Sequence, residues 1–432
     1  MSKRIIFPVC LFVLFLNVSF IHAQNNTKNP YSMYGLGELR PQTNAANAGM
    51  GNVGIGMKSR AFLNVTNPAS YSGMDSLSVL LELGVDGRFS RFESLNRKAN
   101  SWTANFSYLA MGMRISSKFA FGFGINPYSN VGYEINTKSE VGGASFEYPL
   151  DISGSGNINR VYVGLSYNPF KNLSIGVKPS FLFGSIEQVQ LHRLMAIPPS
   201  EWEHLTGYPF ANISNVTKNY FHNFIFEFGA QYTIDLKKVD LTIGAIYNPG
   251  MYLVSDRVDN TYDSDGNVFE NKRSVNDDFQ VPEEYGAGIA FTTSNFTGGI
   301  DVGVQKWSNH KYDLFRVKLK DNPYIRAGLE YTPSYNIYDP SLKYYQRVSY
   351  RAGFQYSESY MKFYDMEQDE YSISLGLGLP VLNKGAKASR IDVGFEFGRS
   401  GSTAGRLIKE NYFRVRLGFS LRDFWFQHRI YD

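Results

Sequence analysis

The chain has 432 residues and a formal net charge of +4, and only 19% of its residues are charged. This near-neutral balance gives no support to nucleic-acid binding. Aromatic residues and glycines are abundant, with 33 Phe, 30 Tyr and 40 Gly. That composition suits a membrane β-barrel, although the length also fits two soluble all-β domains.

The N-terminus has the pattern of a secretory signal peptide. Lys3 and Arg4 make a basic start, an apolar run follows from Ile5 to Phe20, and Ala23 is a small residue at the expected cleavage point. A membrane-anchoring helix is the alternative, but the run is shorter than the roughly 20 residues that a span needs. We expect residues 1–23 to be removed, and with them the only cysteine.

The next segment is rich in Gly, Ala and Asn, carries little charge, and lacks both the helical and the strand period. It runs from Asn44 to Asp75. We predict a compact plug here, with residues 24–76 forming an N-terminal hatch and residues 77–432 forming a barrel around it. The residues expected to let the hatch pack and turn are Gly49, Gly51, Gly54, Gly56, Asn67, Pro68 and Ala69.

The same glycines offer a competing interpretation. Gly49 to Gly54 matches the dinucleotide-binding pattern GxGxxG. No strand precedes it, and no alternation of strands and helices surrounds it, so the context of that motif is missing. Tight backbone packing is the better explanation of the glycines.

From Ser76 onward, apolar and polar residues alternate with the period of two that is typical of strands. In Ile391–Phe397, odd positions are apolar and even positions are polar or Gly, and Phe413–Leu421 repeats the pattern. We predict about fourteen strands, near residues 77–89, 103–115, 119–126, 159–168, 173–188, 221–234, 239–254, 282–292, 296–307, 323–332, 347–356, 370–379, 390–398 and 411–421.

The connections between these strands differ in length. Short turns such as 116–118 and 169–172 alternate with long predicted loops at 91–102, 127–158, 189–220 and 255–281. Short periplasmic turns opposite long outer loops are typical of outer-membrane barrels. The predicted fold is therefore all-β: a transmembrane antiparallel barrel of about 14 strands, with the hatch inside the lumen. Its expected location is the outer membrane of a Gram-negative bacterium, in contact with outer-membrane lipid.

The polar faces of these strands carry full charges of both signs, which a wet lumen would accommodate. We expect these charges to hold the hatch against the wall. They are Asp301, Arg326, Glu330, Arg351, Asp392, Glu396, Arg414 and Arg416.

The longest predicted loop has apolar residues near helical spacing, which could expose an apolar surface that captures a hydrophobic molecule. A lid packed on neighbouring loops is the alternative. The candidate ligand-binding residues are Leu191, Leu194, Met195, Ile197 and Trp202.

No catalytic constellation stands out, so we expect no enzyme activity, no cofactor and no metal. There is no nucleophile elbow and no paired-carboxylate signature. The mature histidines form no HExxH pair. Asp263-Ser264-Asp265-Gly266 resembles a calcium loop, but the twelfth ligand position would be Lys272, so a turn is the better interpretation.

Several motifs recur in the order found in one known family. They are GMGNVGIG before Asn67-Pro68-Ala69, then Val281-Pro282-Glu283, Lys306-Trp307-Ser308, and the run from Arg351 to Ser357. With these motifs the chain resembles the FadL-like long-chain fatty acid transporters of the outer membrane, in the divergent form common in Bacteroidetes. The opening at Asn29–Gly37 and the tail beyond Phe424 depart from that family's pattern.

The resemblance implies a fourteen-stranded barrel that is blocked by its hatch. It also implies capture of hydrophobic ligands by outer loops, and release through a strand kink or after hatch movement. The expected function is uptake of hydrophobic small molecules such as long-chain fatty acids. The alternative is a barrel that acts as a scaffold or shuttle in type IX secretion-like protein export and has a protein partner.

Overall fold

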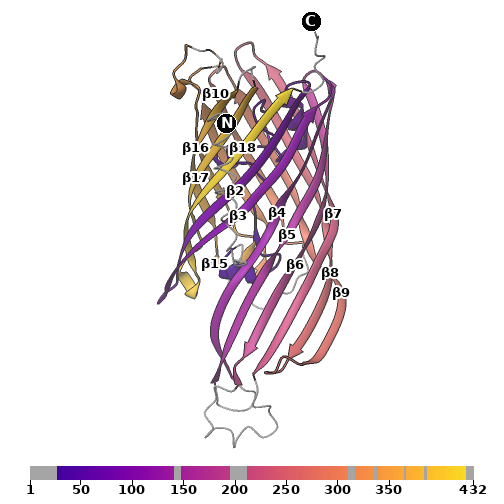
Figure 1. Ribbon diagram of the computed structural model, residues 1–432, viewed down its shortest axis with the longest axis vertical. Coiled ribbons are helices and arrows are strands. Elements are labelled where there is room, and N and C mark those ends of the chain that lie inside the picture. Colours follow the sequence, from indigo (N-terminus) through magenta and orange to yellow (C-terminus); the bar gives the residue numbers. More distant parts are fainter. Residues whose placement is uncertain are drawn as a thin grey trace, which may run out of the picture.

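The computed structural model describes residues 27–424 apart from 141–146, 195–211, 310–316, 335, 337–338, 340, 364–365 and 384–386. In this part of the chain, fourteen long strands form one antiparallel sheet that closes when β18 pairs with β2 (Figure 1). The predicted all-β barrel of fourteen strands is thereby confirmed. The predicted signal peptide lies outside the described residues.

The barrel strands run in chain order around the wall. They are β2 (Ser78–Glu93), β3 (Lys98–Arg114), β4 (Phe119–Glu140), β5 (Glu147–Phe170), β6 (Leu173–His192), β7 (Ile213–Asp235), β8 (Asp240–Tyr262), β9 (Val268–Thr292), β10 (Phe296–Lys306), β12 (Asn322–Tyr331), β13 (Ser349–Ser357), β16 (Glu370–Asn383), β17 (Lys387–Ser400) and β18 (Lys409–Phe424).

Alternation along each strand separates a lipid-facing surface from a lumen-facing one. On β2, Leu81, Leu83 and Val85 point outward and are about 40% exposed, whereas Glu82 and Asp86 point inward and are buried. Apolar side chains on the outside and polar ones inside are what a membrane-spanning strand requires. No described helix is long and apolar enough to cross a membrane.

Strands β4 to β9 extend much farther toward the long-loop end than the sequence predicted. β4 continues to Glu140 and β5 begins at Glu147, within the predicted loop 127–158, and the predicted loops 189–220 and 255–281 are shortened in the same way. These extensions carry polar residues on both faces and therefore lack the alternation that reveals a half-buried strand. Figure 1 shows that this side of the barrel is the longer one.

The N-terminal segment lies inside the barrel. It contains two 3-10 helices, η1 (Pro30–Met33) and η2 (Pro68–Gly73), a short strand β1 (Glu38–Leu39) and a one-turn helix α2 (Ala45–Ala48). Every residue from 43 to 57 is buried. We call this segment, residues 27–76, the hatch.

A second, smaller sheet lies among the loops at the long-loop end. It consists of β11 (Val317–Leu319), β14 (Met361–Phe363) and β15 (Met366–Glu367). Tyr31 of η1 packs against Phe363 of this sheet, with ring centroids 4.8 Å apart. The hatch therefore reaches from the short-turn end of the barrel up to its outer loops.

Candidate functional site: the plugged lumen and its side opening

One wall carboxylate holds the glycine-rich turn of the hatch. Asp301 on β10 is fully buried and accepts hydrogen bonds from the backbone N–H groups of Gly54 and Ile55, at 2.6 and 2.9 Å. A carboxylate that accepts backbone N–H groups makes a charge-assisted bond, roughly twice as strong as a neutral one. That Asp301 holds the hatch remains a prediction, and these two hydrogen bonds are the contacts through which it would act.

Glycines on the wall meet glycines of the hatch, which allows two backbones to approach closely. A Cβ atom at Gly353 or at Gly328 would overlap the backbone of the Met50–Gly51 turn. Gly51 itself has φ +65°, a left-handed conformation that favours glycine, and its own Cβ would lie 2.6 Å from the carbonyl oxygen of Phe354. The remaining hatch glycines predicted from the sequence pack in the same interior, since Gly49 approaches Gly376 and Gly56 approaches Ala290.

Asn67, Pro68 and Ala69 form the second fixed turn of the hatch. The Asn67 side chain caps η2 by accepting from the Ala69 N–H at 3.0 Å, and it donates to the Ile55 carbonyl at 2.8 Å. Pro68 and Ala69 pack against Gly176 on β6. One asparagine thus joins two parts of the hatch where they meet the wall.

The remaining predicted charges lie in the lumen but mostly contact one another. Arg351 bonds Glu330 at 2.6 Å and Asp392 at 2.7 Å, and Glu396 bonds Arg414 at 3.2 Å. Arg416 reaches the hatch by donating to Thr43 Oγ1 at 3.1 Å, and the Arg326 guanidinium lies over the Tyr324 ring. Arg351, Glu330, Asp392, Glu396 and Arg414 thus pair within the wall, and Arg416 is the member of this set that bonds the hatch.

Several contacts of charged residues between the hatch and the wall were not predicted from the sequence. Hatch Glu38 pairs with Arg88, and hatch Arg40 pairs with Asp86. Burial alone would raise the pKa of Glu38, but Arg88 and Arg40 hold it below its usual value. Glu82 accepts from the Leu63 N–H at 2.8 Å. Glu82, Asp86 and Arg88 all stand at even positions of β2. The period of two along that strand could therefore have predicted that their side chains point into the lumen.

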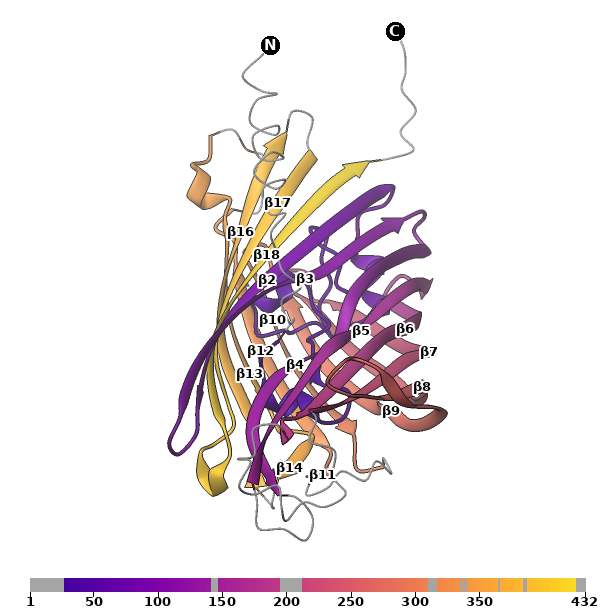
Figure 2. The same cartoon turned by 60° about the horizontal axis from the view of Figure 1, so that its bottom comes forward.

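The wall is interrupted where β4 leaves β3. The two strands pair only between Leu109–Arg114 and Ala120–Ile125. Beyond that point β4 loses its alternation, because residues 126–133 are all buried except the half-buried Tyr128. β4 therefore bends into the lumen, and Figure 2 shows β2 and β3 diverging from it toward the long-loop end.

The hatch takes the place of β3 along the bent part of β4. Leu39 lies opposite Ser129 in antiparallel register, and the Arg40 N–H donates to the Tyr128 carbonyl at 3.0 Å. The Gln42 side chain donates to the Pro127 carbonyl at 3.3 Å. Unpaired backbone groups at membrane depth are costly, so these contacts stabilise the bend. The hatch thus covers the side opening as well as the lumen.

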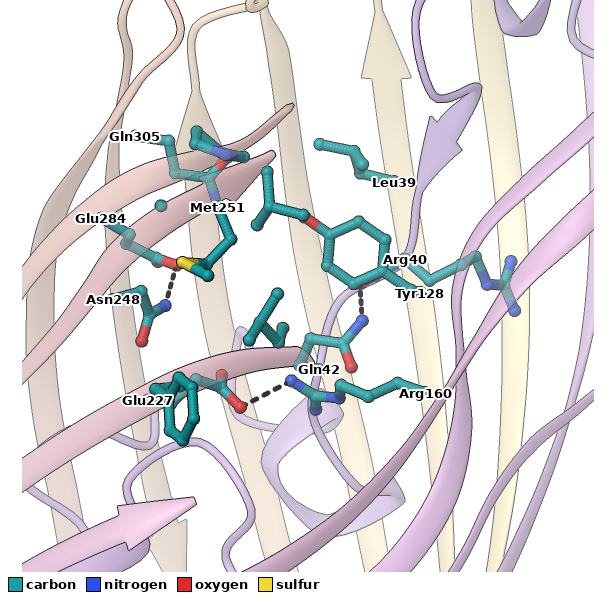
Figure 3. Close-up of a pocket in the computed structure, with 15 residues that line it drawn as sticks. Leu39, Arg40, Gln42, Tyr128, Arg160, Glu227, Asn248, Met251, Glu284 and Gln305 are labelled. Carbon is teal, nitrogen blue, oxygen red and sulfur yellow. Dashed lines mark hydrogen bonds and ion pairs between the residues drawn. The ribbon is translucent and has the colours of Figure 1, made fainter. Parts of the chain in front are cut away.

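A cavity of about 70 Å³ lies beside β1 of the hatch and the residues that follow it, at the level of the bend in β4 (Figure 3). Tyr128, Phe226 and Gly250 are among the residues that line it. The wall is irregular there too, because β7 and β8 are unpaired between His222 and Phe228. Glu227 beside the cavity binds both Arg160 and Lys178 at 2.9 Å.

Between the hatch and the outer loops, the lumen is filled by an apolar cluster. The wall contributes residues such as Ile225 and Leu253, and the loops contribute Trp307 and Tyr360. Trp307 and Tyr360 stack with ring centroids 4.4 Å apart. This cluster has more buried apolar residues than the other two clusters among the described residues, and the sequence analysis assigned it no role.

The predicted ligand-binding loop is mostly outside the described residues. Leu191 lies on β6 opposite Asp151, and Leu194 follows the strand; both are half-buried. Met195, Ile197 and Trp202 lie outside the described residues. Their role remains a prediction.

The fold matches solved outer-membrane channels. The chain superposes on the CymD monoaromatic hydrocarbon channel with a TM-score of 0.57 and 15% identity, covering 91% of this chain and 99% of that one. On the P. putida toluene transporter TodX it superposes with a TM-score of 0.58 and 15% identity, covering 91% of this chain and 99% of that one. On a Pseudomonas aeruginosa FadL homologue it superposes with a TM-score of 0.57 and 14% identity, covering 90% of this chain and 100% of that one. No curated protein sequence matches the chain.

By its fold, the chain is a closed fourteen-stranded barrel with its N-terminal segment inside, and this fold is similar to that of the solved channels. The chain belongs to the BamG family, whose sequence model matches residues 1–432.

Proposed function

We propose that this protein carries hydrophobic small molecules across the outer membrane, and that movement of the hatch opens the route. The observation that carries the proposal is the position of residues 38–42, which replace β3 along the bent part of β4. A displacement of this one segment would free the opening in the side of the barrel.

The proposed route begins at the apolar cluster under the outer loops. A hydrophobic molecule would replace contacts such as the Trp307–Tyr360 stack, at little cost in buried apolar area. Leu191, Leu194, Met195, Ile197 and Trp202 would receive it first. From the cluster the molecule would pass β1 of the hatch and leave the barrel between β3 and β4. The outward side chains of Trp102 and Phe106 on β3 would meet lipid there.

Long-chain fatty acids are the ligand class that we propose first. The structural neighbours are described as carriers of toluene and monoaromatic hydrocarbons, so smaller apolar compounds belong in the same test. The proposal includes export by a signal peptide at residues 1–23, a hatch at residues 24–76 and a barrel at residues 77–432. It involves no catalysis.

A second candidate is a closed barrel that acts as a scaffold or shuttle for a protein partner in export. The small cavities beside hatch residues 38–42, about 70 and 210 Å³, favour it, because drug-sized ligands occupy pockets of roughly 300–1,000 Å³. The many buried hatch–wall contacts also suit a barrel that stays closed.

Mass spectrometry of small molecules that co-purify with the barrel distinguishes the two candidates. An unrelated outer-membrane barrel prepared in the same detergent is the control. We expect fatty acids or other hydrophobic compounds to be enriched over the control. Lack of any enrichment, together with a stable protein partner found by crosslinking, would favour the scaffold.

A further inference from the structure

A hollow that we call the vestibule lies at the short-turn end of the barrel, which faces the periplasm in the orientation derived above. Its volume is about 950 Å³. Hatch residues 57–62 and 72–76 form its floor, and the turns at 237–240 and 292–294 form part of its rim. Neither the transport route nor the side opening uses this space.

Cations outnumber carboxylates two to one in the vestibule. Two of its three carboxylates are paired with arginines. Glu330 binds Arg351 at 2.6 Å and the vestibule's own Arg390 at 3.3 Å. Asp75 binds Arg422 and, at 3.8 Å, the vestibule's own Arg60. Asp240 is the third carboxylate. The other four vestibule cations have no carboxylate partner of this kind within the vestibule lining. The six basic side chains that line the vestibule are Lys58, Arg60, Arg114, Lys237, Lys238 and Arg390.

Two of these cations are held by neutral groups. Lys58 donates to Ser174 Oγ and to Thr233 Oγ1, both at 3.1 Å. Arg114 donates to three backbone carbonyls, the nearest being that of Met74 at 2.9 Å. Burial, and secondly the charge of Arg114, lower the pKa of Lys58 to about 8, while Asp240 acts in the opposite direction. Bound negative charge would therefore be stabilised here.

The arrangement of the cations indicates the form of that negative charge. A single small anion is held by donors that converge on one point. Here the cations come from the hatch, the end of β3 and the β7–β8 turn. An adjoining hollow of about 240 Å³ adds Arg347. Positive charge spread over a wide, open surface is complementary to a chain that carries several carboxylates.

We propose that this vestibule is a docking site for an acidic segment of a periplasmic polypeptide. The extended segment lies across the floor with its carboxylates facing the separate cations. This docking does not depend on the transported molecule, so it stands or falls independently of the proposed transport.

The test is the binding of fluorescein-labelled hexaglutamate to the full barrel in lipid nanodiscs, followed by fluorescence anisotropy. A neutral Gly-Ser hexapeptide and hexalysine are the reference peptides. The test variant is Lys237→Gln/Lys238→Gln, which changes an exposed turn. The matched control is Lys138→Gln/Lys272→Gln, which removes two exposed lysines at the opposite end of the barrel.

We expect hexaglutamate alone to bind, to lose affinity as salt is raised, and to bind the test variant about fivefold more weakly. The control variant should bind like the native barrel. In protein carrying ¹³C-methylated lysines, the pKa of Lys58 should rise on peptide binding. Equal binding of all three peptides, or equal affinity of both variants, overturns the proposal. Complete displacement of the peptide by inorganic phosphate also overturns it, because that result indicates a site for single anions.

Discussion

Replacing Asp301 by Asn is expected to unseat the hatch and turn a closed barrel into an open channel. Asp301 accepts from two backbone N–H groups in a site without solvent. Both N–H groups donate to the same carboxylate oxygen, Oδ2, so the carbonyl oxygen of asparagine can still accept them, but without the negative charge. Weakening two charge-assisted bonds costs about 2–4 kcal/mol. A change of that size raises the population of the open state about a hundredfold.

Single-channel conductance in planar bilayers measures this effect directly. The native barrel should show rare and small openings, and D301N should show frequent, large ones. Asp259→Asn is the matched control, because Asp259 lies near the long-loop end of β8 and binds Arg257 and Thr217 instead of the hatch. Conductance of D301N equal to that of the control would mean that Asp301 does not hold the hatch.

Replacing Gly353 by Ala is expected to have the second large effect. The added methyl group would overlap the backbone of Met50 and Gly51, which cannot rotate away as a flexible side chain would. Overpacking at such a site costs about 3 kcal/mol. Because the barrel strands keep their pairing, we expect the barrel to fold while the hatch turn is displaced.

Hydrogen exchange followed by mass spectrometry separates these two consequences. Peptides covering residues 44–57 should lose protection in G353A, while wall peptides keep theirs and the folded barrel keeps its mobility in unheated gels. Gly394→Ala is the control, because its methyl group would approach hatch atoms only to 3.4 Å. Native protection of the hatch in G353A would show that the close contact is not needed.

The sequence predicted the wall better than the contents of the barrel. A half-buried strand must alternate, so the strands between Ile391 and Leu421 could be recognised residue by residue. The polar ends of β4 to β9 could not, because no apolar face reveals them. The bend of β4 is a similar case, since residues 126–133 are buried on both faces and show no period.

The hatch could be located but its contacts could not be derived. Its composition and its place before the first strand predicted a plug. The partner of each hatch residue depends on which wall residue lies opposite, and sequence spacing does not give that. The Arg40–Asp86 and Glu38–Arg88 pairs were missed for this reason, and so was the pairing of Leu39 with Ser129.

The most direct test of the account is uptake of radiolabelled oleate and toluene by cells that carry Leu39→Cys/Ser129→Cys. These residues face each other in antiparallel register, and the chain's single cysteine, Cys10, lies in the predicted signal peptide. A wall pair, Gln188→Cys/Thr217→Cys, is the control, because it joins β6 to β7 without touching the hatch. We predict that the oxidised hatch lock abolishes uptake, that reduction restores it, and that the wall pair has no effect. Undiminished uptake with the hatch fully crosslinked to β4 would contradict the account.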